Sequence, residues 1–421
     1  MKTRTMIRPI LILLALVLAV APVLSGCGGP KVASTEKVLR IGMMTPSTGP
    51  VPEKGVPGQH GIQDAMKYIN EELGGAGGYA IQVDWRDSEY NMAKVGTIVQ
   101  DYINIGDILF TTHSSSEMKA AQAIANQNGF PGIATFISTM NLHPAAHIYG
   151  PTPDYGDDWI ALAEYYMANV WKGTGKPKMA LHLLTGTVGV GTLDGANLKA
   201  AELGIDLVAT ENHAIDTKSE IDSLTRIKAK DPDVLIISGT PAPTAVILNN
   251  AEQLGMLDGN MTVMCASASF TKALIDLAPT STEGVYGVFH TVSWEDNVPG
   301  ITKATEYVKK YHPDDYGNMD YLSTWATCLM IREILETAVK NAGYDVLAKG
   351  GPDAWKAVEE QGIQKIKGYK FEGLQGGSAT YTPGDNRLDN YLRMYQVKNG
   401  KIVALGDWEA APLQTYPQYD K

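Results

Sequence analysis

The sequence predicts an α/β protein with two doubly wound lobes. Two observations lead to this prediction: short β-forming runs alternate with helical patterns, and the alternation restarts near the middle of the chain. Strands that alternate with helices of this length indicate βαβ units and a mainly parallel sheet. The length of 421 residues also exceeds that of one typical domain.

In the first half of the chain, four β-forming runs alternate with three helical patterns. The first helical pattern places Ile62, Met66 and Ile69 on one face, which is the spacing of an amphipathic helix. The predicted strands are residues 38–44, 79–85, 108–111 and 132–136. The predicted helices are residues 58–73, 93–103 and 117–128. We expect these elements to form one lobe.

The pattern begins again after residue 156 and predicts a second lobe. Ile221, Leu224 and Ile227 align on one face of a helical segment, whereas 234–238 (VLIIS) is typical of a buried strand. The predicted helices are residues 157–171, 191–203, 219–229 and 243–254. The predicted strands are residues 178–184, 205–211, 234–238 and 261–265. In such sheets ligands bind on the loops beyond the carboxyl ends of the strands.

The last third of the chain does not repeat this alternation. One more strand is predicted over 285–291, followed by helices and then by β-forming runs near the end. The predicted helices are residues 301–311, 321–341 and 352–361, and the later strands are residues 391–398 and 401–405. This part is too short for a third large domain, so we expect it to fold back onto the lobes and to cross between them more than once.

The N-terminus has the pattern of an export signal. Lys2, Arg4 and Arg8 are basic, and an uncharged apolar run over 9–24 follows them. A membrane-spanning helix needs ~20 apolar residues, so this run is short for one. A basic start, a short apolar stretch and small residues at its end predict a signal peptide over 1–26.

The end of this signal is more specific. Leu24-Ser25-Gly26-Cys27 resembles the lipobox of bacterial lipoproteins. The resemblance implies that the signal is removed before Cys27 and that this cysteine carries lipid, which would anchor the protein to a membrane. Residues 27–37 are then predicted to form a flexible tether between the lipid and the folded protein. The alternative is an ordinary signal peptide with a chance cysteine.

Composition and motifs exclude several functions. The net charge of −11 argues against nucleic-acid binding, for which a basic footprint is expected. The Gly spacing over 186–191 does not fit a dinucleotide fingerprint, and no GxSxG elbow or P-loop is found. We therefore expect no catalytic residues, no metal and no cofactor. Cys265 and Cys328 do not make a disulfide framework, and we expect no structural disulfide.

Five segments together resemble a known family. They are IGMMTPSTGP, GIQDAMKYINEELGG, IQVDWRDSEYN, TTHSSSEMKAAQ and DVLIISGTPAPTAVILNNAEQLGM. In order and spacing they are similar to the branched-chain amino-acid binding proteins of ABC importers, which have the type I periplasmic-binding fold. The similarity extends over nearly the whole chain after the signal.

The resemblance implies two Rossmann-like lobes joined by three hinge crossings, with the ligand in the cleft between them. We expect residues 38–153 and 290–368 to form the first lobe, and residues 154–289 and 369–421 to form the second. The resemblance further implies an extracytoplasmic monomer that catalyses no reaction. It would deliver a small solute to ABC permease subunits served by a separate ATPase chain.

Hydroxyl side chains of the first lobe are candidates for ligand binding. Ser114, Ser115 and Ser116 follow a predicted strand and precede a predicted helix, whose N-terminus offers free N–H groups and partial positive charge. These groups suit a carboxylate. The resemblance implies that the ligand carboxylate binds here, with Ser114 the best positional match, and that Ser138 and Thr139 hold the polar head. Helix capping is the alternative explanation for both groups.

Three candidates belong to the second lobe or to the first crossing. Tyr155 stands at the expected first crossing between the lobes, where an aromatic residue can cover a ligand, although such a residue is more often structural. Thr240 stands where the family often has an aromatic residue. Ser267 lies where the amino-acid binders of the family commonly place an acid for the ligand ammonium, and residues 265–270 contain no carboxylate.

An unpaired ammonium in a closed cleft would be costly. Either Asp154 or Glu117 supplies the charge, or the ligand has no ammonium group. A branched-chain or other aliphatic amino acid is the first expectation from the resemblance. An aromatic or aliphatic carboxylate, or an amide-like solute, is the alternative, and a ligand sensor with the same fold is a further one.

Overall fold

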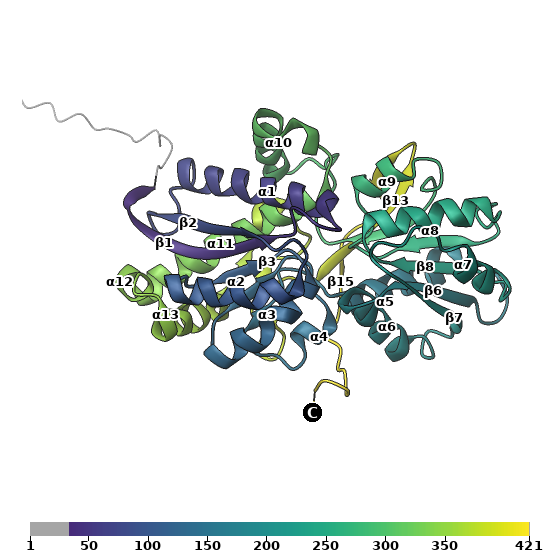
Figure 1. Ribbon diagram of the computed structural model, residues 1–421, viewed down its shortest axis with the longest axis horizontal. Helices are drawn as coiled ribbons and strands as arrows, with labels where there is room; N and C mark the ends of the chain where they lie inside the picture. Colours follow the sequence, from purple (N-terminus) through teal and green to yellow (C-terminus); the bar gives the residue numbers. More distant parts are fainter. Residues whose placement is uncertain (1–32, 421) are drawn as a thin grey trace, which may run out of the picture.

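The computed structural model describes residues 33–420, which form two lobes side by side (Figure 1). The first lobe is built on a parallel five-stranded sheet with the order β2-β1-β3-β4-β5. Its strands are β1 (Ser34–Thr45), β2 (Tyr79–Asp87), β3 (Phe110–Thr112), β4 (Gly132–Ala134) and β5 (Ile148–Tyr149). The predicted α/β class with two lobes is confirmed.

Helices from two distant parts of the chain cover this sheet. The early ones are α1 (Pro52–Glu71), α2 (Met92–Ile105), α3 (Ser115–Asn128) and α4 (Thr139–Leu142). The later ones are α10 (Pro299–Tyr311), α11 (Met319–Ala342), α12 (Tyr344–Leu347) and α13 (Gly351–Ala357), which continues as η3 (Val358–Gly362). Helix α11 packs along α1, where Trp325 stacks on Tyr68 with ring centroids 5.6 Å apart. The chain therefore returns to the first lobe after building the second.

The second lobe has a mixed sheet with the order β14-β13-β10-β9-β8-β6-β7, and β15 pairs with β13. The parallel strands are β6 (Lys178–Leu184), β7 (Asp206–His213), β8 (Val234–Ser238), β9 (Thr262–Cys265) and β10 (Tyr286–Phe289). The antiparallel strands are β13 (Tyr391–Lys398), β14 (Lys401–Ala404) and β15 (Glu409–Ala410). All five residues of β8 are buried, as expected for a central parallel strand with helices on both faces.

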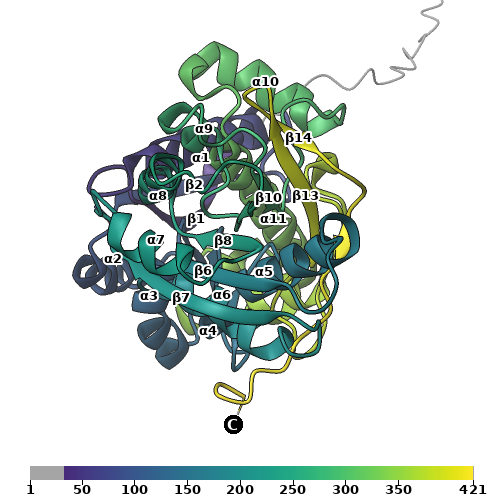
Figure 2. The same cartoon turned by 90° about the vertical axis from the view of Figure 1, so that its right-hand side faces the viewer.

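The helices of the second lobe follow its parallel strands or precede them. They are α5 (Tyr155–Tyr165) with its extension η1 (Tyr166–Val170), α6 (Thr187–Lys199), α7 (Ile221–Lys228), α8 (Pro241–Gln253) and α9 (Lys272–Leu277). Figure 2 looks onto this lobe, with β7 in front and the yellow C-terminal strands along one side.

Three chain segments cross between the lobes. The first (150–154) and the third lie side by side, because Gly150 donates to Asn386 and accepts from Leu388. The second crossing joins β10 to α10. After α13 and η3, the chain forms a small two-stranded sheet of β11 (Lys367–Tyr369) and β12 (Ala379–Thr380). The third crossing follows this sheet and leads to β13, which pairs with β10. Between β11 and β12, η5 (Phe371–Gly373) packs against α10 and α11. The lobe boundary at residue 369 stays a prediction, and this packing favours a later one.

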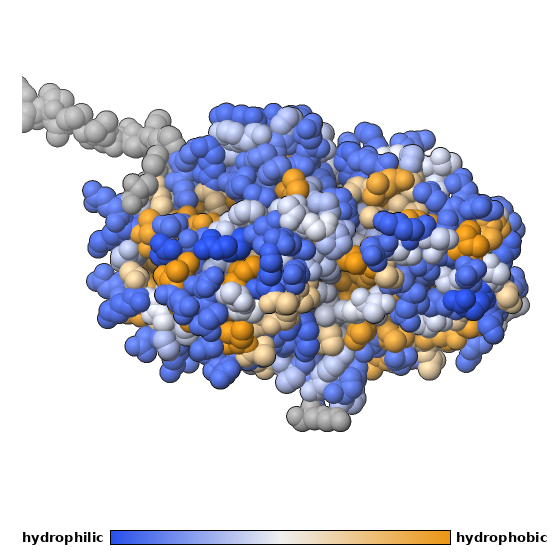
Figure 3. All heavy atoms as spheres, viewed as in Figure 1, coloured by the Kyte–Doolittle hydropathy of each residue, from blue (hydrophilic) through white to orange (hydrophobic). Residues whose placement is uncertain are grey.

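The predicted signal peptide and Cys27 lie outside the described residues. Within residues 33–420, none of the helices combines the length and the apolar character that crossing a membrane requires. Cys265 and Cys328 are both buried free thiols. On the face seen in Figure 3, hydrophobic residues form small scattered groups among polar ones.

Candidate functional site

A small cavity lies between the lobes, beside loops that follow the carboxyl ends of strands in both sheets. It is lined by Pro46, Val51, Lys54, Tyr90, His113, Ser114 and Phe136 of the first lobe and by Tyr155, Val188, Thr240 and Ala268 of the second. Its volume is about 20 Å³. Pockets that hold small molecules measure roughly 300–1,000 Å³. The structure is therefore a closed form whose lobes must part before a solute can enter.

The chain approaches the cavity closely at the start of α1. A Cβ atom on Gly55 would lie 1.9 Å from the carbonyl oxygen of Pro46, so only glycine allows this contact. Pro52 occupies the first helical position, where no N–H is needed. This close approach brings Lys54, in the first turn of α1, to the cavity wall.

Lys54 forms a buried ion pair there. Its Nζ lies 2.5 Å from Oδ1 of Asp320, which stands in the first turn of α11, and 4.4 Å from the ring centroid of Phe136. Nε2 of His113 lies 3.5 Å from the same carboxylate oxygen. Burial alone would raise the pKa of Asp320, but the ammonium of Lys54 and the imidazole of His113 outweigh burial and lower it. Asp320 is therefore a carboxylate at neutral pH.

Several buried polar atoms at or beside the cavity have no hydrogen-bond partner among the described residues. They are both ring nitrogens of His113, Oγ1 of Thr240, Oδ2 of Asp320 and Oε1 of Glu53. A buried polar atom without a partner costs about 1–3 kcal/mol. A solute that bonds to these atoms would recover part of that free energy. This concentration of unpartnered atoms distinguishes the cavity as the candidate binding site.

The serines predicted to bind ligand divide into two groups. Ser114 lines the cavity and caps α3: its Oγ accepts from the N–H of Glu117, whose Oε2 accepts from the N–H of Ser114. Because that Oγ acts as an acceptor, the hydroxyl proton stays available to a ligand. Ser115, Ser138 and Thr139 do not line the cavity, since their hydroxyls bond to α6 of the other lobe.

Of the remaining candidates, Tyr155 and Thr240 line the cavity and Ser267 does not. The hydroxyl and the N–H of Ser267 both donate to Oδ2 of Asp158, at 2.6 Å and 3.0 Å. The other oxygen of Asp158 lies 2.7 Å from Nε2 of His290. An acid thus stands beside Ser267, but its oxygens are already engaged inside the protein.

The two acids proposed for a ligand ammonium also have other partners. Asp154 caps α5 by accepting from the N–H groups of Gly156 and Asp157. Glu117 accepts from Ser114 and from the hydroxyl of Ser88, and burial raises its pKa. Neither carboxylate lines the cavity.

Sequence reasoning missed four of the residues that give the cavity its character. They are Lys54, Tyr90, His113 and Phe136. Tyr90, His113 and Phe136 each follow a strand of the first sheet within three residues, so their positions were a usable signal. Lys54 gave no such signal, because it lies inside α1. Asp320 could not be found in this way, because it is 266 residues from Lys54 in the chain.

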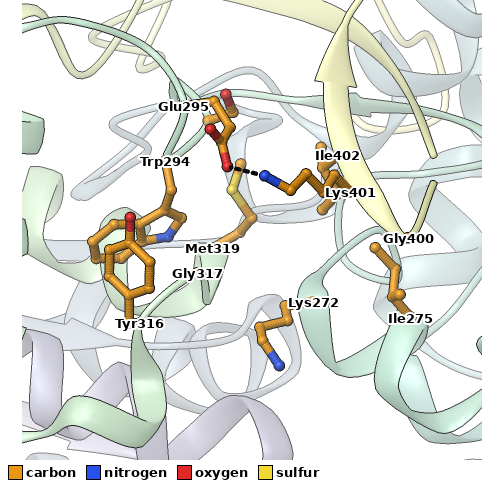
Figure 4. A pocket seen from close by; sticks show the side chains of 11 residues that line it. Lys272, Ile275, Trp294, Glu295, Tyr316, Gly317, Met319, Gly400, Lys401 and Ile402 are labelled. Carbon is orange, nitrogen blue, oxygen red and sulfur yellow. Dashed lines mark hydrogen bonds and ion pairs between the residues drawn. The ribbon is translucent and has the colours of Figure 1, made fainter. Parts of the chain in front are cut away.

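A second, wider pocket of about 260 Å³ lies at the junction of α9, β14 and the second crossing (Figure 4). Trp294 and Tyr316 pack edge to face at 5.0 Å on one side, and Lys401 reaches Glu295 at the rim. This second pocket shares no lining residue with the cavity between the lobes. None of the described residues that line it has a buried polar atom without a hydrogen-bond partner. We therefore place the candidate site at the cavity.

Within residues 33–420, no cluster of three or more His, Cys, Asp or Glu side chains is placed to hold a metal.

Comparison with known proteins identifies the class. The profile of a family described as periplasmic binding protein matches residues 38–401, which is most of the chain. The chain therefore belongs to the periplasmic binding protein family. Members of this family are extracytoplasmic solute-binding proteins of ABC transporters and are not enzymes. No curated protein is significantly similar in sequence to the chain.

Solved structures agree with this assignment. A branched-chain amino-acid ABC transporter protein from Thermus thermophilus with bound valine is 20% identical, with 90% of this chain and 97% of that one covered and a TM-score of 0.76. A leucine-binding protein from Thermotoga maritima is 17% identical, with coverage of 87% and 98% and a TM-score of 0.71. A solute-binding protein from Rhodopseudomonas palustris in complex with p-hydroxybenzoic acid is 14% identical, with coverage of 89% and 98% and a TM-score of 0.73. At these identities the likeness establishes the type I fold.

Proposed function

We propose that this protein is the solute-binding component of an ABC importer and that its solute carries a carboxylate group. One observation carries the proposal: the described residues that line the cavity include one lysine, Lys54, and no Arg, Asp or Glu. The unpartnered ring nitrogens of His113 and hydroxyl of Thr240 stand beside it. A cation and hydrogen-bonding groups in a closed, desolvated site suit an anion.

A cleft that closes around a solute must be wider than the cavity of about 20 Å³ seen here, and the same lining residues support a specific arrangement of the solute in it. Its carboxylate would accept from Lys54, from the hydroxyl of Ser114 and from the N-terminus of α3, which carries partial positive charge. Its body would lie against Phe136 and Val188, which are apolar. A benzoate-like or small aliphatic carboxylate has this combination of one anionic end and an apolar body.

An amino acid is the second candidate. The related structures with valine and a leucine-binding function favour it, and so does one feature of the cleft. Glu53 stands next to Lys54 without lining the cavity; its Oε1 has no hydrogen-bond partner among the described residues, and burial raises the pKa of this carboxyl. An ammonium group beside Glu53 would supply both a hydrogen bond and a countercharge.

A thermal-shift screen of the protein without its first 26 residues, refolded to remove carried-over solute, tests the proposal. The panel holds amino acids, benzoate-like and aliphatic carboxylates, and amides. A solute at ~100 times its dissociation constant stabilises the protein by about 2.7 kcal/mol. Shifts with carboxylates that lack an amino group support the first candidate, and shifts with valine or leucine alone support the second. Shifts with amides alone would contradict the carboxylate assignment.

Two further parts of the proposal have separate tests. Anchoring through lipid on Cys27 predicts that the mature protein partitions into the membrane fraction and that Cys27→Ala releases it. A role in transport rather than in sensing predicts genes for a permease and an ATPase next to the gene of this protein. A signalling gene in their place would favour a sensor.

A further inference from the structure

The first turn of α6 joins the second lobe to the first. Thr187 Oγ1 lies 2.7 Å from the hydroxyl of Ser115 and 2.8 Å from that of Ser116. The hydroxyl of Ser138 donates to the backbone oxygen of Thr187 at 2.7 Å. Thr187, Ser115 and Ser138 are all buried. One residue of the second lobe therefore bonds to three serines of the first.

Asp194 makes a second connection on the same face of α6. It lies seven residues after Thr187, which is about two helical turns. Its Oδ2 accepts from the hydroxyl of Thr139 at 2.5 Å, across the two lobes. Its carboxylate also accepts from Gln418 at 3.0 Å and from the hydroxyl of Tyr419 at 2.9 Å.

Gln418 and Tyr419 belong to the end of the chain, which touches both lobes. We call residues 412–420 the C-terminal strap. Asp420 Oδ1 lies 3.0 Å from Nδ1 of His143 in the first lobe, and the ring of buried Tyr416 packs edge to face on the same histidine at 5.0 Å. The hydroxyl of Tyr416 also packs against Gly156 of α5, where a Cβ atom would come within 2.4 Å. Figure 1 shows this segment (yellow) running past α4 at the junction of the lobes.

We propose that Thr187, Asp194 and the C-terminal strap form a latch that favours the closed cleft and thereby sets the affinity for solute. The proposal rests on the solute-binding function proposed above. Hydrogen bonds between the lobes exist only when the lobes meet, so they stabilise the closed form alone. None of these bonds involves a residue that lines the cavity. The latch therefore acts mainly on how often the cleft is closed, and it touches the cavity only through Ser116, whose hydroxyl accepts from that of the lining residue Tyr90 at 3.2 Å.

Population arithmetic gives the expected size of the effect. A solute that binds the closed form has an apparent affinity proportional to the closed fraction of the solute-free protein, as long as that fraction is small. Loss of one hydrogen bond changes an equilibrium by about 2- to 12-fold. Thr187→Val removes both hydrogen bonds of Oγ1, so we expect it to reduce the ratio of closed to open protein by at least about 2-fold. Removal of residues 413–421 should reduce this ratio as well.

The test measures the distance between the lobes in the solute-free protein that lacks its first 27 residues. Spin labels on Lys119→Cys of the first lobe and Asp222→Cys of the second report this distance. Cys265 and Cys328 do not compete for the label, because both are buried and burial raises the pKa of each thiol. Thr187→Val, Asp194→Asn and the protein ending at Pro412 should each shift the distribution toward the open form. Thr187→Ser should restore it. Thr225→Val is the matched control, because the hydroxyl of Thr225 bonds only within α7.

Two outcomes overturn the latch: the three altered proteins keep the wild-type distribution, or the wild type is already open without solute. Circular dichroism identifies a variant that fails to fold, in which case the remaining two decide. With a solute from the screen, the loss of affinity should match the loss of closed protein. The distances between the spin labels are measured without solute, so they test the latch whatever the screen finds. A screen in which no solute binds would contradict the proposed function alone.

Discussion

Lys54 and Asp320 determine the charge of the cleft at the scale of single residues. They lie in the first turns of α1 and α11, which are distant in sequence but pack side by side, and each side chain is almost fully buried. A buried ion pair adds little net stability, because desolvation of the two charges cancels most of their attraction. Because Lys54 lines the cavity, the pair bears more on binding than on stability.

Lys54→Met should be much more harmful than removal of both charges. The single variant leaves the carboxylate of Asp320 buried without a countercharge, which costs about 3–5 kcal/mol. We expect a loss of this size in the free energy of unfolding, measured by urea titration at pH 7. The double variant Lys54→Met with Asp320→Asn should recover most of it.

The same double variant separates stability from recognition. It keeps a folded cleft without the cation, so we expect it to lose binding of any carboxylate found by the screen. Calorimetric titration measures this directly. Carboxylate binding by the double variant with unchanged affinity would contradict the role of Lys54.

At the scale of elements, strands β6 and β7 bring two buried histidines together. His182 and His213 lie with their Nδ1 atoms 3.0 Å apart, so one ring donates to the other. Burial, and then repulsion from His182, lowers the pKa of His213 to about 3. The pKa of His182 is also lowered, mainly by burial. Both rings are therefore neutral in the folded protein at pH 7.

Lowering the pH should reduce the free energy of unfolding through His213. Below an unfolded pKa of about 6.5, His213 takes up a proton only in the unfolded state, so stability is lost progressively as pH falls from about 6.5 toward 3. We expect His213 alone to account for about 2 kcal/mol between pH 7 and pH 5. Urea titrations at both pH values should show a smaller loss for His213→Gln. An equal loss in the variant would assign the effect to other groups.

The elements were largely predictable because their local patterns are strong. Strands β6 and β8 begin and end where the sequence predicts, and α1, α3 and α11 differ from the prediction only at their ends. The start of α1 was missed since Pro52, Gly55 and Pro57 are poor signals of a helix. Strand β5 and helix α4 were missed because two and four residues carry no measurable periodicity.

The site was less predictable, for a physical reason. Three of the residues that the sequence singled out, Ser114, Tyr155 and Thr240, line the cavity. Whether a hydroxyl faces the cavity or the opposite lobe depends on how the lobes close, and no local pattern records that. Ser115 is the example, since its partner Thr187 lies 72 residues away.

At the scale of the whole molecule, Arg387 ties the third crossing to the second lobe at the hinge. This buried residue of the third crossing pairs with Asp157 of α5 at 2.7 Å and with Asp385 at 2.8 Å. The nearby Asp154 has a raised pKa, because of burial and then the charge of Asp157. One guanidinium thus compensates three acids between the first and third crossings.

Arg387→Met should destabilise the protein by about 3–5 kcal/mol, because it leaves buried carboxylates without a countercharge. Urea unfolding at pH 7 measures the loss. Arg393→Met is the matched control: its partner Asp296 is partly exposed, so we expect a loss below about 1 kcal/mol. Similar losses in the two variants would show that the ion pairs of Arg387 contribute no more to stability than the partly exposed pair of Arg393.

The closed cavity of about 20 Å³ also limits how fast a solute can leave. Nothing the size of an amino acid or a benzoate passes through the closed form, so every departure waits for the lobes to part. Hinge motions of this kind take microseconds to milliseconds. The residence time of the solute therefore has a lower limit set by the protein, and a transporter that accelerates delivery must do so by opening the lobes.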